Sequence, residues 1–159
     1  MIWENLNESI LFTSLKAKTS DEVMAIIGKA LIDEGYVKEN YIDALIKREK
    51  EYPTGLDING FGVAIPHTSV EYVKKATVAI AILEEPVKFV QMGTDDEVTN
   101  VKVVFMLVVV DPNKHMENLQ RVIQIIQDQD ILKLLGQSKS KQEIIDVVKK
   151  KELSLWKKE

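Results

Sequence analysis

The longest apolar stretch of the chain runs from Val101 to Val110 and contains one charged residue, Lys102. Large apolar and β-branched residues that follow one another without alternation are typical of a strand buried on one or both faces of a sheet. A second such run, from Thr77 to Leu83, predicts another buried strand. Amphipathic helical patterns lie before and after these runs. We therefore expect an α/β (α+β) chain in which helices pack on a mixed sheet.

Capping patterns indicate where helices begin. Thr19 followed by Glu22, and Ser140 followed by Glu143, are capping-box pairs ahead of apolar residues at helical spacing. Asn113 is the expected cap of the helix that follows the long apolar run. The other expected elements are an edge strand or extended arm at 10–15, a helix from Asn40 that ends before Pro53, a short helical turn within 69–75, and a short helix at 131–135.

The segment from Gly62 to His67 ends in a Pro-His pair. Its first residues, Gly62 to Ile65, predict a short strand, and the turn-forming residues at 54–62 predict a loop or a tight hairpin. Pro66 stops the strand because it fixes φ and offers no N–H. The backbone therefore aims the imidazole of His67, whose ordinary pKa of about 6.5 suits a nucleophile or proton carrier near neutral pH. His67 is the candidate reactive residue.

Composition excludes several classes of protein. A chain of 159 residues suits one domain with one substantial core. The net charge of -4, with no long basic run, argues against a nucleic acid partner. Without cysteine there is no disulfide framework, Cys-ligated zinc or thiol nucleophile. No apolar stretch reaches the roughly 20 residues of a membrane span, and the N-terminal residues lack a signal-peptide pattern. We expect no direct membrane insertion and a cytoplasmic location.

His67 and His115 are the two histidines of the chain. His115 lies at the start of the helix that follows the strand expected at 101–110. If the strands before the two histidines are neighbours, both imidazoles meet at one edge of the sheet, where α/β folds tend to place their sites. Each histidine also has an alternative interpretation as an ordinary surface or packed residue. A metal site from both histidines and carboxylates is a third possibility, although no ligand spacing supports it.

Arg48 and the pair Thr54-Gly55 are the other candidate site residues. A guanidinium fork, a hydroxyl and a closely approaching backbone N–H together suit phosphoryl oxygens. The alternative for Arg48 is a helix-surface salt bridge to Glu49 or Glu51. The chain has no P-loop, dinucleotide-binding glycine motif, zincin motif or nucleophile elbow, which argues against nucleotide kinases, dinucleotide enzymes, zincins and α/β-hydrolases.

Residues 44–55 (Ala-Leu-Ile-Lys-Arg-Glu-Lys-Glu-Tyr-Pro-Thr-Gly) and Gly62–His67 together resemble the enzyme IIA components of the bacterial sugar phosphotransferase system (PTS), in the mannitol/fructose class. The resemblance covers nearly the whole chain and looks most like the galactitol-specific branch. It implies the mannitol/fructose-type enzyme IIA fold as a single domain over 5–152, followed by a tail at 153–159 that we expect to fray.

The resemblance also implies a function and partners. The protein would be a phosphotransferase with a phosphohistidine intermediate and with no cofactor or metal. His67 would accept a phosphoryl group from phospho-HPr and pass it to a cognate IIB component, which serves the membrane IIC component in uptake of galactitol or a related polyol. Arg48, Thr54 and His115 match positions that hold the phosphoryl group. The alternative is a nitrogen-regulatory type of IIA, in which phosphorylation of His67 switches binding to another protein.

Acidic residues lie between the two long expected strands, at Glu84, Glu85 and 95–97. One interpretation is a solvated hairpin or loop. The other is a partner-binding patch, such as a contact for a basic face of HPr.

Overall fold

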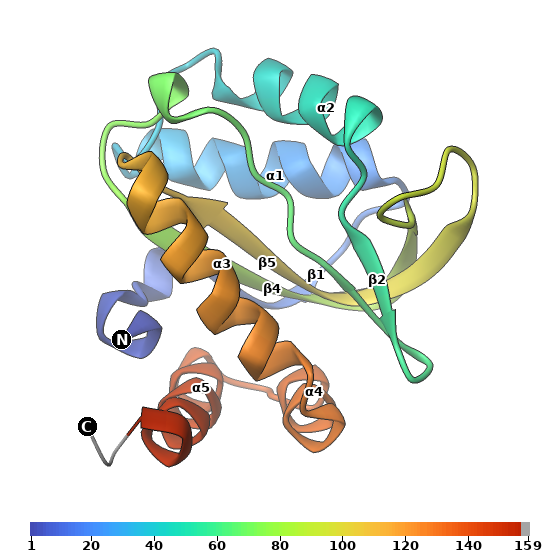
Figure 1. Cartoon of the computed structure of the whole chain (residues 1–159), viewed down its shortest axis with the longest axis vertical. Coiled ribbons are helices and arrows are strands. Elements are labelled where there is room, and N and C mark those ends of the chain that lie inside the picture. Colours follow the sequence, from blue (N-terminus) through green and yellow to red (C-terminus); the bar gives the residue numbers. More distant parts are fainter. Residues whose placement is uncertain (157–159) are drawn as a thin grey trace.

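The computed structural model describes residues 1–156, except for the side chains of His115 and Trp156. Five strands form one mixed sheet in the order β1-β4-β5-β3-β2 (Figure 1). The strands are β1 (Leu11–Leu15), β2 (Gly55–Ile58), β3 (Phe61–Ala64), β4 (Thr77–Val90) and β5 (Val98–Val108), and the helices are α1 (Ser20–Asp33), α2 (Tyr41–Glu51), α3 (Pro112–Ile126), α4 (Gln129–Gly136) and α5 (Lys141–Trp156). Short 3-10 turns occupy Ile2–Asn5, Glu8–Ile10 and Val70–Tyr72. None of the described helices is both long and apolar enough to cross a membrane.

Helices cover both faces of the sheet. α1 and α2 lie on one face, and α3, α4 and α5 lie on the other (Figure 1). Alternate residues of β5 enter two different cores: Val104, Met106 and Val108 pack on the α1–α2 side, and Val103, Phe105 and Leu107 pack on the α3–α5 side. Side chains alternate along a strand, so a strand covered on both faces needs an uninterrupted apolar run. The predicted fold class and both buried strands are confirmed.

The strand before His67 is the second strand of a tight hairpin. Asn59 and Gly60 join β2 to β3, and both have positive φ (51° and 91°), as the two-residue turns of twisted hairpins require. β3 pairs in parallel with β5, so the carboxyl ends of the two strands lie at the same edge of the sheet. His67 follows β3 and α3 follows β5, which is the arrangement that the sequence required for a shared site.

β4 is longer than predicted and includes part of the acidic stretch. Residues 84–86 belong to this strand, at a bulge where its register with β5 shifts, and do not form the predicted loop. Pro86 is tolerated there because a bulge leaves residues outside the ladder. Lys102 stabilises the bulge by donating a hydrogen bond from Nζ to the carbonyl oxygen of Leu83 at 2.6 Å. The acidic residues 95–97 lie apart from the bulge, near the turn between β4 and β5.

Two helix ends differ from the sequence expectations. Asp111, not Asn113, caps α3: its Oδ1 accepts the Asn113 N–H at 2.9 Å, and Pro112 occupies the first helical position, where an N–H is not needed. α5 continues to Trp156, beyond the domain end expected at residue 152. The remainder of the expected tail, 157–159, lies outside the described residues.

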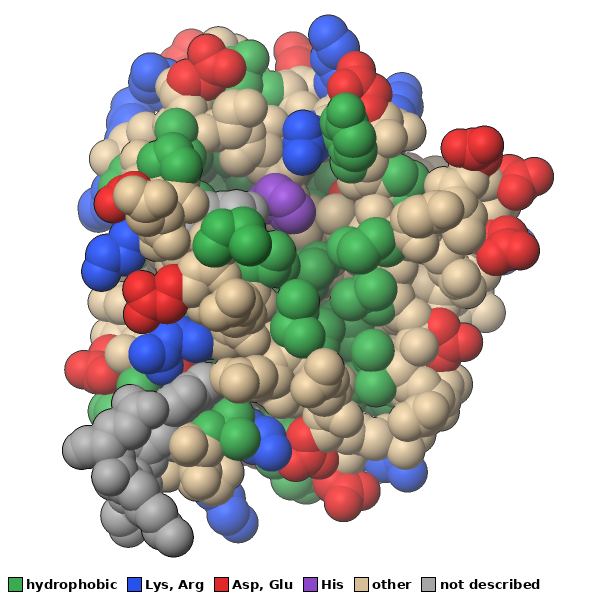
Figure 2. All heavy atoms as spheres, in the orientation of Figure 1, with side chains coloured by type: hydrophobic (Ala, Val, Ile, Leu, Met, Phe, Trp, Pro, Cys, Tyr) green, Lys and Arg blue, Asp and Glu red, His purple; other side chains and the backbone are tan. Residues whose placement is uncertain are grey.

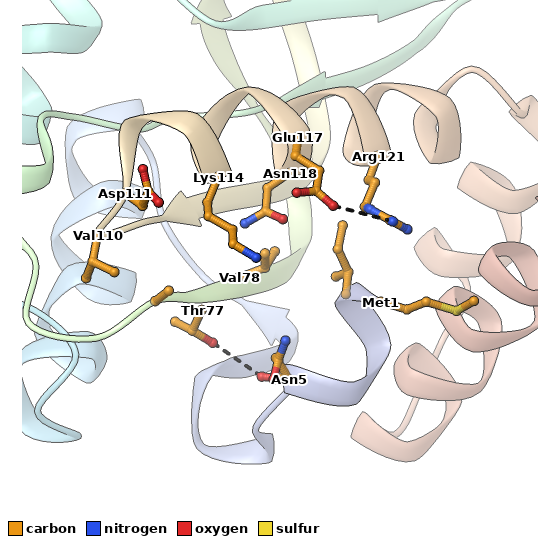
Figure 3. Close-up of a pocket in the computed structure, with 12 residues that line it drawn as sticks. Met1, Asn5, Thr77, Val78, Val110, Asp111, Lys114, Glu117, Asn118 and Arg121 are labelled. Carbon is orange, nitrogen blue, oxygen red and sulfur yellow. Dashed lines mark hydrogen bonds and ion pairs between the residues drawn. The ribbon is translucent and has the colours of Figure 1, made fainter. Parts of the chain in front are cut away.

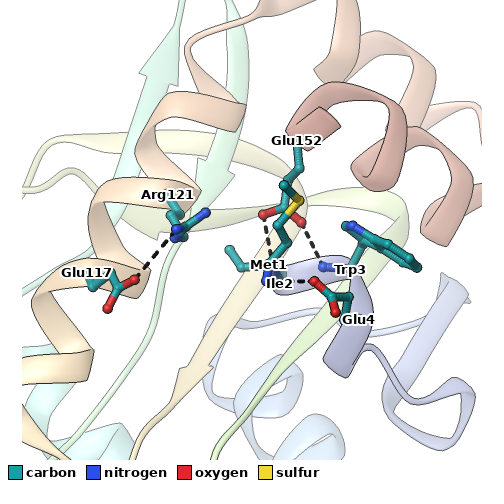
Figure 4. Close-up of polar contacts among 7 residues, drawn as sticks. All are labelled: Met1, Ile2, Trp3, Glu4, Glu117, Arg121 and Glu152. Atoms are coloured by element: carbon teal, nitrogen blue, oxygen red, sulfur yellow. Dashed lines mark hydrogen bonds and ion pairs between the residues drawn. The ribbon is translucent and has the colours of Figure 1, made fainter. Parts of the chain in front are cut away.

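A buried carboxylate fastens the N-terminal turn to the last helix. Glu152 on α5 has no exposed surface. It accepts hydrogen bonds from the backbone N–H groups of Ile2 at 2.9 Å and Trp3 at 2.7 Å (Figure 4). Both N–H groups belong to the first residues of a 3-10 turn and have no partner within it, so the carboxylate acts as their cap. This contact joins residues from opposite ends of the sequence.

We expect Glu152→Ala to lower the free energy of unfolding by about 2–3 kcal/mol, because two N–H groups lose their acceptor in a buried place. Glu152→Gln keeps the shape of the side chain and one acceptor oxygen, and we expect it to be less destabilising than alanine. Urea unfolding of the three proteins measures both differences. An alanine variant as stable as the parent would contradict a stabilising role for this contact.

Candidate functional site

The backbone on both sides of His67 is held by hydrogen bonds. Ile65 N donates to the carbonyl oxygen of Thr54 at 3.4 Å and to Thr54 Oγ1 at 3.3 Å. Pro66 offers no N–H, but its carbonyl oxygen accepts the N–H of Leu107 in β5 at 3.2 Å. The regular strand ends at Ala64. The short segment from Ile65 to His67 is hydrogen-bonded to Thr54, just before β2, and to Leu107 in β5.

The imidazole of His67 is oriented by a neighbouring carbonyl group. Its Nδ1 lies 2.9 Å from the carbonyl oxygen of Ile65. A carbonyl oxygen can only accept a hydrogen bond, so in the neutral ring the hydrogen is on Nδ1 and the in-plane lone pair is on Nε2. The lone pair is what a nucleophile needs, so Nε2 is the atom of this ring suited to attack an electrophile.

The environment of His67 favours the neutral form of its ring. Burial lowers the pKa of His67, the hydrogen bond to Ile65 opposes this effect, and the positive charge of Arg48 lowers the pKa further. The side chain is only partly buried, however, and Figure 2 shows the described histidine (purple) at the surface, beside a blue cationic side chain and above a band of green apolar side chains. The lowered pKa thus favours the neutral ring, and the partial exposure leaves the ring accessible to a large partner.

Arg48 lies in the last turn of α2 and is exposed. Its guanidinium stacks on the ring of Tyr52, with the central carbon 4.1 Å from the ring centroid. Within the described part of the chain it forms no ion pair with Glu49 or Glu51, which was the alternative for this residue. The stacking holds the guanidinium fork while leaving its N–H donors available for an anion near His67. The sequence had not assigned a role to Tyr52, although its position four residues after Arg48, directly at the end of α2, was a usable signal.

Glu49 points inward and binds Thr54. Both residues are buried, with 8% and 4% of their surfaces exposed. Thr54 N donates to Glu49 Oε2 at 2.8 Å, and Thr54 Oγ1 donates to Glu49 Oε1 at 2.9 Å. Burial raises the pKa of Glu49 to about 7, against the opposite effect of these two hydrogen bonds. The Thr54 hydroxyl thus donates its hydrogen to a buried carboxylate in this structure, and its contact with a phosphoryl group stays a prediction.

His115 lies in the first turn of α3, whose start follows β5 at the same edge of the sheet as His67. The sequence assigned its imidazole to the site, but that side chain lies outside the described residues. Among the residues that the structure does describe, no group of three His, Asp or Glu side chains is placed to hold a metal ion.

A cavity of about 490 Å³ lies elsewhere, between α3, the start of β4 and the N-terminal turn (Figure 3). Its lining includes Lys114, Glu117, Asn118 and Arg121 from α3, and Glu117 and Arg121 form an ion pair at 3.6 Å. Neither His67 nor Arg48 lines this cavity. Of the candidate site residues whose side chains are described, His67 and Arg48 are thus separate from this cavity.

The sequence profile of the family described as "Phosphoenolpyruvate-dependent sugar phosphotransferase system, EIIA 2" matches residues 4–151. The galactitol-specific EIIA component of Escherichia coli (strain K12) is 31% identical over 114 residues, which are 72% of this chain and 75% of that protein. The mannitol-specific EIICBA component of Pasteurella multocida is 26% identical over 147 residues. This match covers 91% of the present chain but only 22% of that much longer relative.

Solved structures of similar fold include IIA mannitol from Escherichia coli, with a TM-score of 0.75, 26% identity, and coverage of 90% of this chain and 98% of that chain. The complex of IIAMTL with phosphorylated IIBMTL, also from Escherichia coli, matches with a TM-score of 0.76 at 25% identity, over 91% and 97% of the two chains. Nitrogen regulatory protein IIA-Ntr from Neisseria meningitidis matches with a TM-score of 0.72 at 26% identity, over 92% and 98%. The enzyme IIA fold expected from the sequence is confirmed.

Proposed function

This chain belongs to the EIIA 2 family of the phosphoenolpyruvate-dependent sugar phosphotransferase system, and from that membership we propose that it is a phosphocarrier whose phosphoryl group resides on His67. The observation that carries the proposal is the hydrogen bond between His67 Nδ1 and the carbonyl oxygen of Ile65, which leaves the lone pair on Nε2. A neutral ring with one oriented lone pair, beside an exposed guanidinium, suits nucleophilic attack on a phosphoryl group.

The proposed donor is phospho-HPr. The Nε2 lone pair of His67 forms a new N–P bond while the N–P bond to the donor histidine breaks, and the electrons of the broken bond return to the donor imidazole. Nδ1 keeps its hydrogen on the Ile65 carbonyl throughout. The Arg48 fork binds the phosphoryl oxygens as the group moves, and His115 is a second proposed contact.

The proposed acceptor is a IIB component, which serves a membrane IIC component in uptake of a sugar, and the transfer takes place in the cytoplasm. Support comes from the Escherichia coli structure of IIAMTL in complex with phosphorylated IIBMTL, to which this chain is similar. The identity to a galactitol-specific EIIA component supports galactitol or a related polyol as the transported sugar. The surface position of His67 also suits transfer between two proteins.

A regulatory role is the second candidate. It is favoured by the likeness to nitrogen regulatory protein IIA-Ntr from Neisseria meningitidis. In that case phosphorylated His67 would change the affinity for another protein, because a phosphoryl group adds negative charge at an interface. Both candidates require phosphorylation of His67 and differ in the fate of the phosphoryl group.

The test is phosphoryl uptake by the purified chain. It is incubated with phosphoenolpyruvate, enzyme I and HPr, and its intact mass is measured at alkaline pH, where phosphohistidine survives. We expect a gain of one acid-labile phosphoryl group, followed by its loss when a galactitol-type IIB component is added. Uptake without transfer to IIB would favour the regulatory role, and the absence of uptake by a folded chain would contradict both.

We expect Arg48→Ala to slow phosphoryl uptake about a hundredfold, because the transferring group loses its cationic donor. The same change removes a charge that lowers the pKa of His67, so the pKa of His67 should rise in an NMR titration of the ring. Arg48→Lys is the matched variant: it keeps the charge and hence the pKa of His67, but it loses the planar fork and recovers only part of the rate. An unchanged uptake rate in the alanine variant would remove Arg48 from the site.

A further inference from the structure

The carboxylate of Glu49 uses both of its oxygens on a single residue. Oε2 accepts the backbone N–H of Thr54 at 2.8 Å and Oε1 accepts its hydroxyl at 2.9 Å. Glu49 is the residue after Arg48 on α2, and Thr54 is the residue before β2. A buried carboxylate with two donors is a strong, directional contact, so Glu49 fixes the position of Thr54 relative to the end of α2.

Thr54 in turn holds Ile65. The Ile65 N–H points at both the carbonyl oxygen and the Oγ1 of Thr54, at 3.4 and 3.3 Å. Because the Thr54 hydroxyl donates its hydrogen to Glu49, its lone pairs face the Ile65 N–H. The next carbonyl along the chain, that of Pro66, is held by Leu107 at 3.2 Å. The Ile65 carbonyl lies between the Ile65 N–H and the Pro66 carbonyl, which are both hydrogen-bonded. Its oxygen accepts the hydrogen bond from His67 Nδ1 at 2.9 Å.

We propose that Glu49 and Thr54 are positioning residues that select the Nδ1–H tautomer of His67 by holding Ile65, and so keep the lone pair on Nε2. The inference rests on the proposed function, in which Nε2 receives the phosphoryl group. This role explains why a buried carboxylate lies beside the site. In its ionised form Glu49 accepts the hydrogen of the Thr54 hydroxyl, and the hydroxyl oxygen can then accept the N–H of Ile65. It also ties the helix end that carries Arg48 to the segment that carries His67.

Three variants separate this role from ordinary packing. Thr54→Val keeps the shape of the side chain but removes the hydroxyl that links Glu49 to Ile65. Glu49→Gln keeps the shape but turns an amide donor toward Thr54 Oγ1, which reverses that hydrogen bond. Thr54→Ser restores the hydroxyl and should restore the parent behaviour. Glu51→Gln is the matched control, because it removes the same charge from an exposed position on the same helix.

The first readout is the tautomer of His67, measured from the ring ¹⁵N shifts of the isolated chain above the pKa of this ring. We expect the Nδ1–H form to dominate in the parent, in Thr54→Ser and in Glu51→Gln, and the Nε2–H form to increase in Thr54→Val and Glu49→Gln. A purely structural role would lower the unfolding temperature of these two variants without altering the tautomers. That result would overturn the proposal. If Thr54→Val does not fold, Glu49→Gln against Glu51→Gln decides the question.

The second readout is the rate of phosphoryl uptake from phospho-HPr. We expect Thr54→Val and Glu49→Gln to slow it by between about tenfold and a hundredfold, as misplaced reacting groups do, with Thr54→Ser close to the parent. Unchanged rates in both variants would also overturn the proposal. The tautomer measurement needs no partner protein. A parent chain that takes up no phosphoryl group would therefore contradict the proposed function alone. NMR would still decide whether Glu49 and Thr54 select the tautomer of His67.

Discussion

His67→Ala should take up no phosphoryl group from phospho-HPr under conditions in which the parent chain is fully converted. The reason is chemical, because the variant has no lone-pair nitrogen at the position that the Ile65 carbonyl and Arg48 define. The fold should persist, since the side chain is only partly buried and its hydrogen bond to Ile65 is worth about 1 kcal/mol. Intact-mass analysis at alkaline pH measures the uptake, and far-ultraviolet circular dichroism verifies the fold.

His67→Gln is the matched control for this loss. It fills more of the space of the ring and keeps an N–H donor, but an amide nitrogen is not a nucleophile, so we expect no uptake here either. An acid-labile phosphoryl group on either variant would place the acceptor elsewhere. His115 is the other histidine of the chain, so the double variant with His115→Ala would then show whether it had received the group.

Gly62→Ala should destabilise the chain by about 3 kcal/mol or more, at the upper end of the usual cost of overpacking. A Cβ on Gly62 would overlap the carbonyl oxygen of Asn100 and lie 2.6 Å from its carbonyl carbon. Both atoms belong to the backbone of β5, which is the central partner of β3 and cannot move aside as a flexible side chain would. β3 must therefore separate from β5, and the segment that leads to His67 moves with it.

Gly136→Ala is the matched control, since the nearest atoms to its added Cβ are at the end of the Phe61 ring, 3.2 Å away. A ring can shift by a few tenths of an ångström, and alanine is favoured over glycine in a helix by up to about 1 kcal/mol, so this variant should differ little from the parent. Urea unfolding measures both changes. If Gly62→Ala unfolds at the same urea concentration as Gly136→Ala, the close contact between β3 and β5 is not as the structure describes it.

Features that depend on local chemistry could be predicted from the sequence. The unbroken run at 101–110 predicted a strand buried on one or both faces, the turn-forming residues at 54–62 predicted a loop or a tight hairpin, and Pro66 had to end the strand before His67. Each conclusion needs only the period of the apolar residues or the geometry of one residue type. The candidate reactive histidine followed from the same local arguments.

Features that depend on pairing across the sheet could not be predicted in this way. The sequence ended the first long strand at Leu83, because Glu84, Glu85 and Pro86 are typical of a loop. The structure carries the strand through them to Val90. The reason is that Lys102, on the neighbouring strand, stabilises the bulge through the Leu83 carbonyl, and a contact between residues 19 positions apart leaves no local pattern.

The roles of Arg48, Glu49 and Thr54 were decided by the tertiary structure alone. Consecutive residues on a helix point about 100° apart, so Arg48 and Glu49 can face different surroundings, and their order in the sequence does not say which of them is buried. In the folded chain Glu49 points inward and accepts the Thr54 hydroxyl, and Arg48 is exposed and stacks on Tyr52. The sequence by itself thus determined the candidate reactive histidine, His67, and predicted Arg48, Thr54 and His115 as its neighbours. Only the tertiary structure decided which of the described side chains face inward and which face solvent, because only folding sets the direction of each side chain.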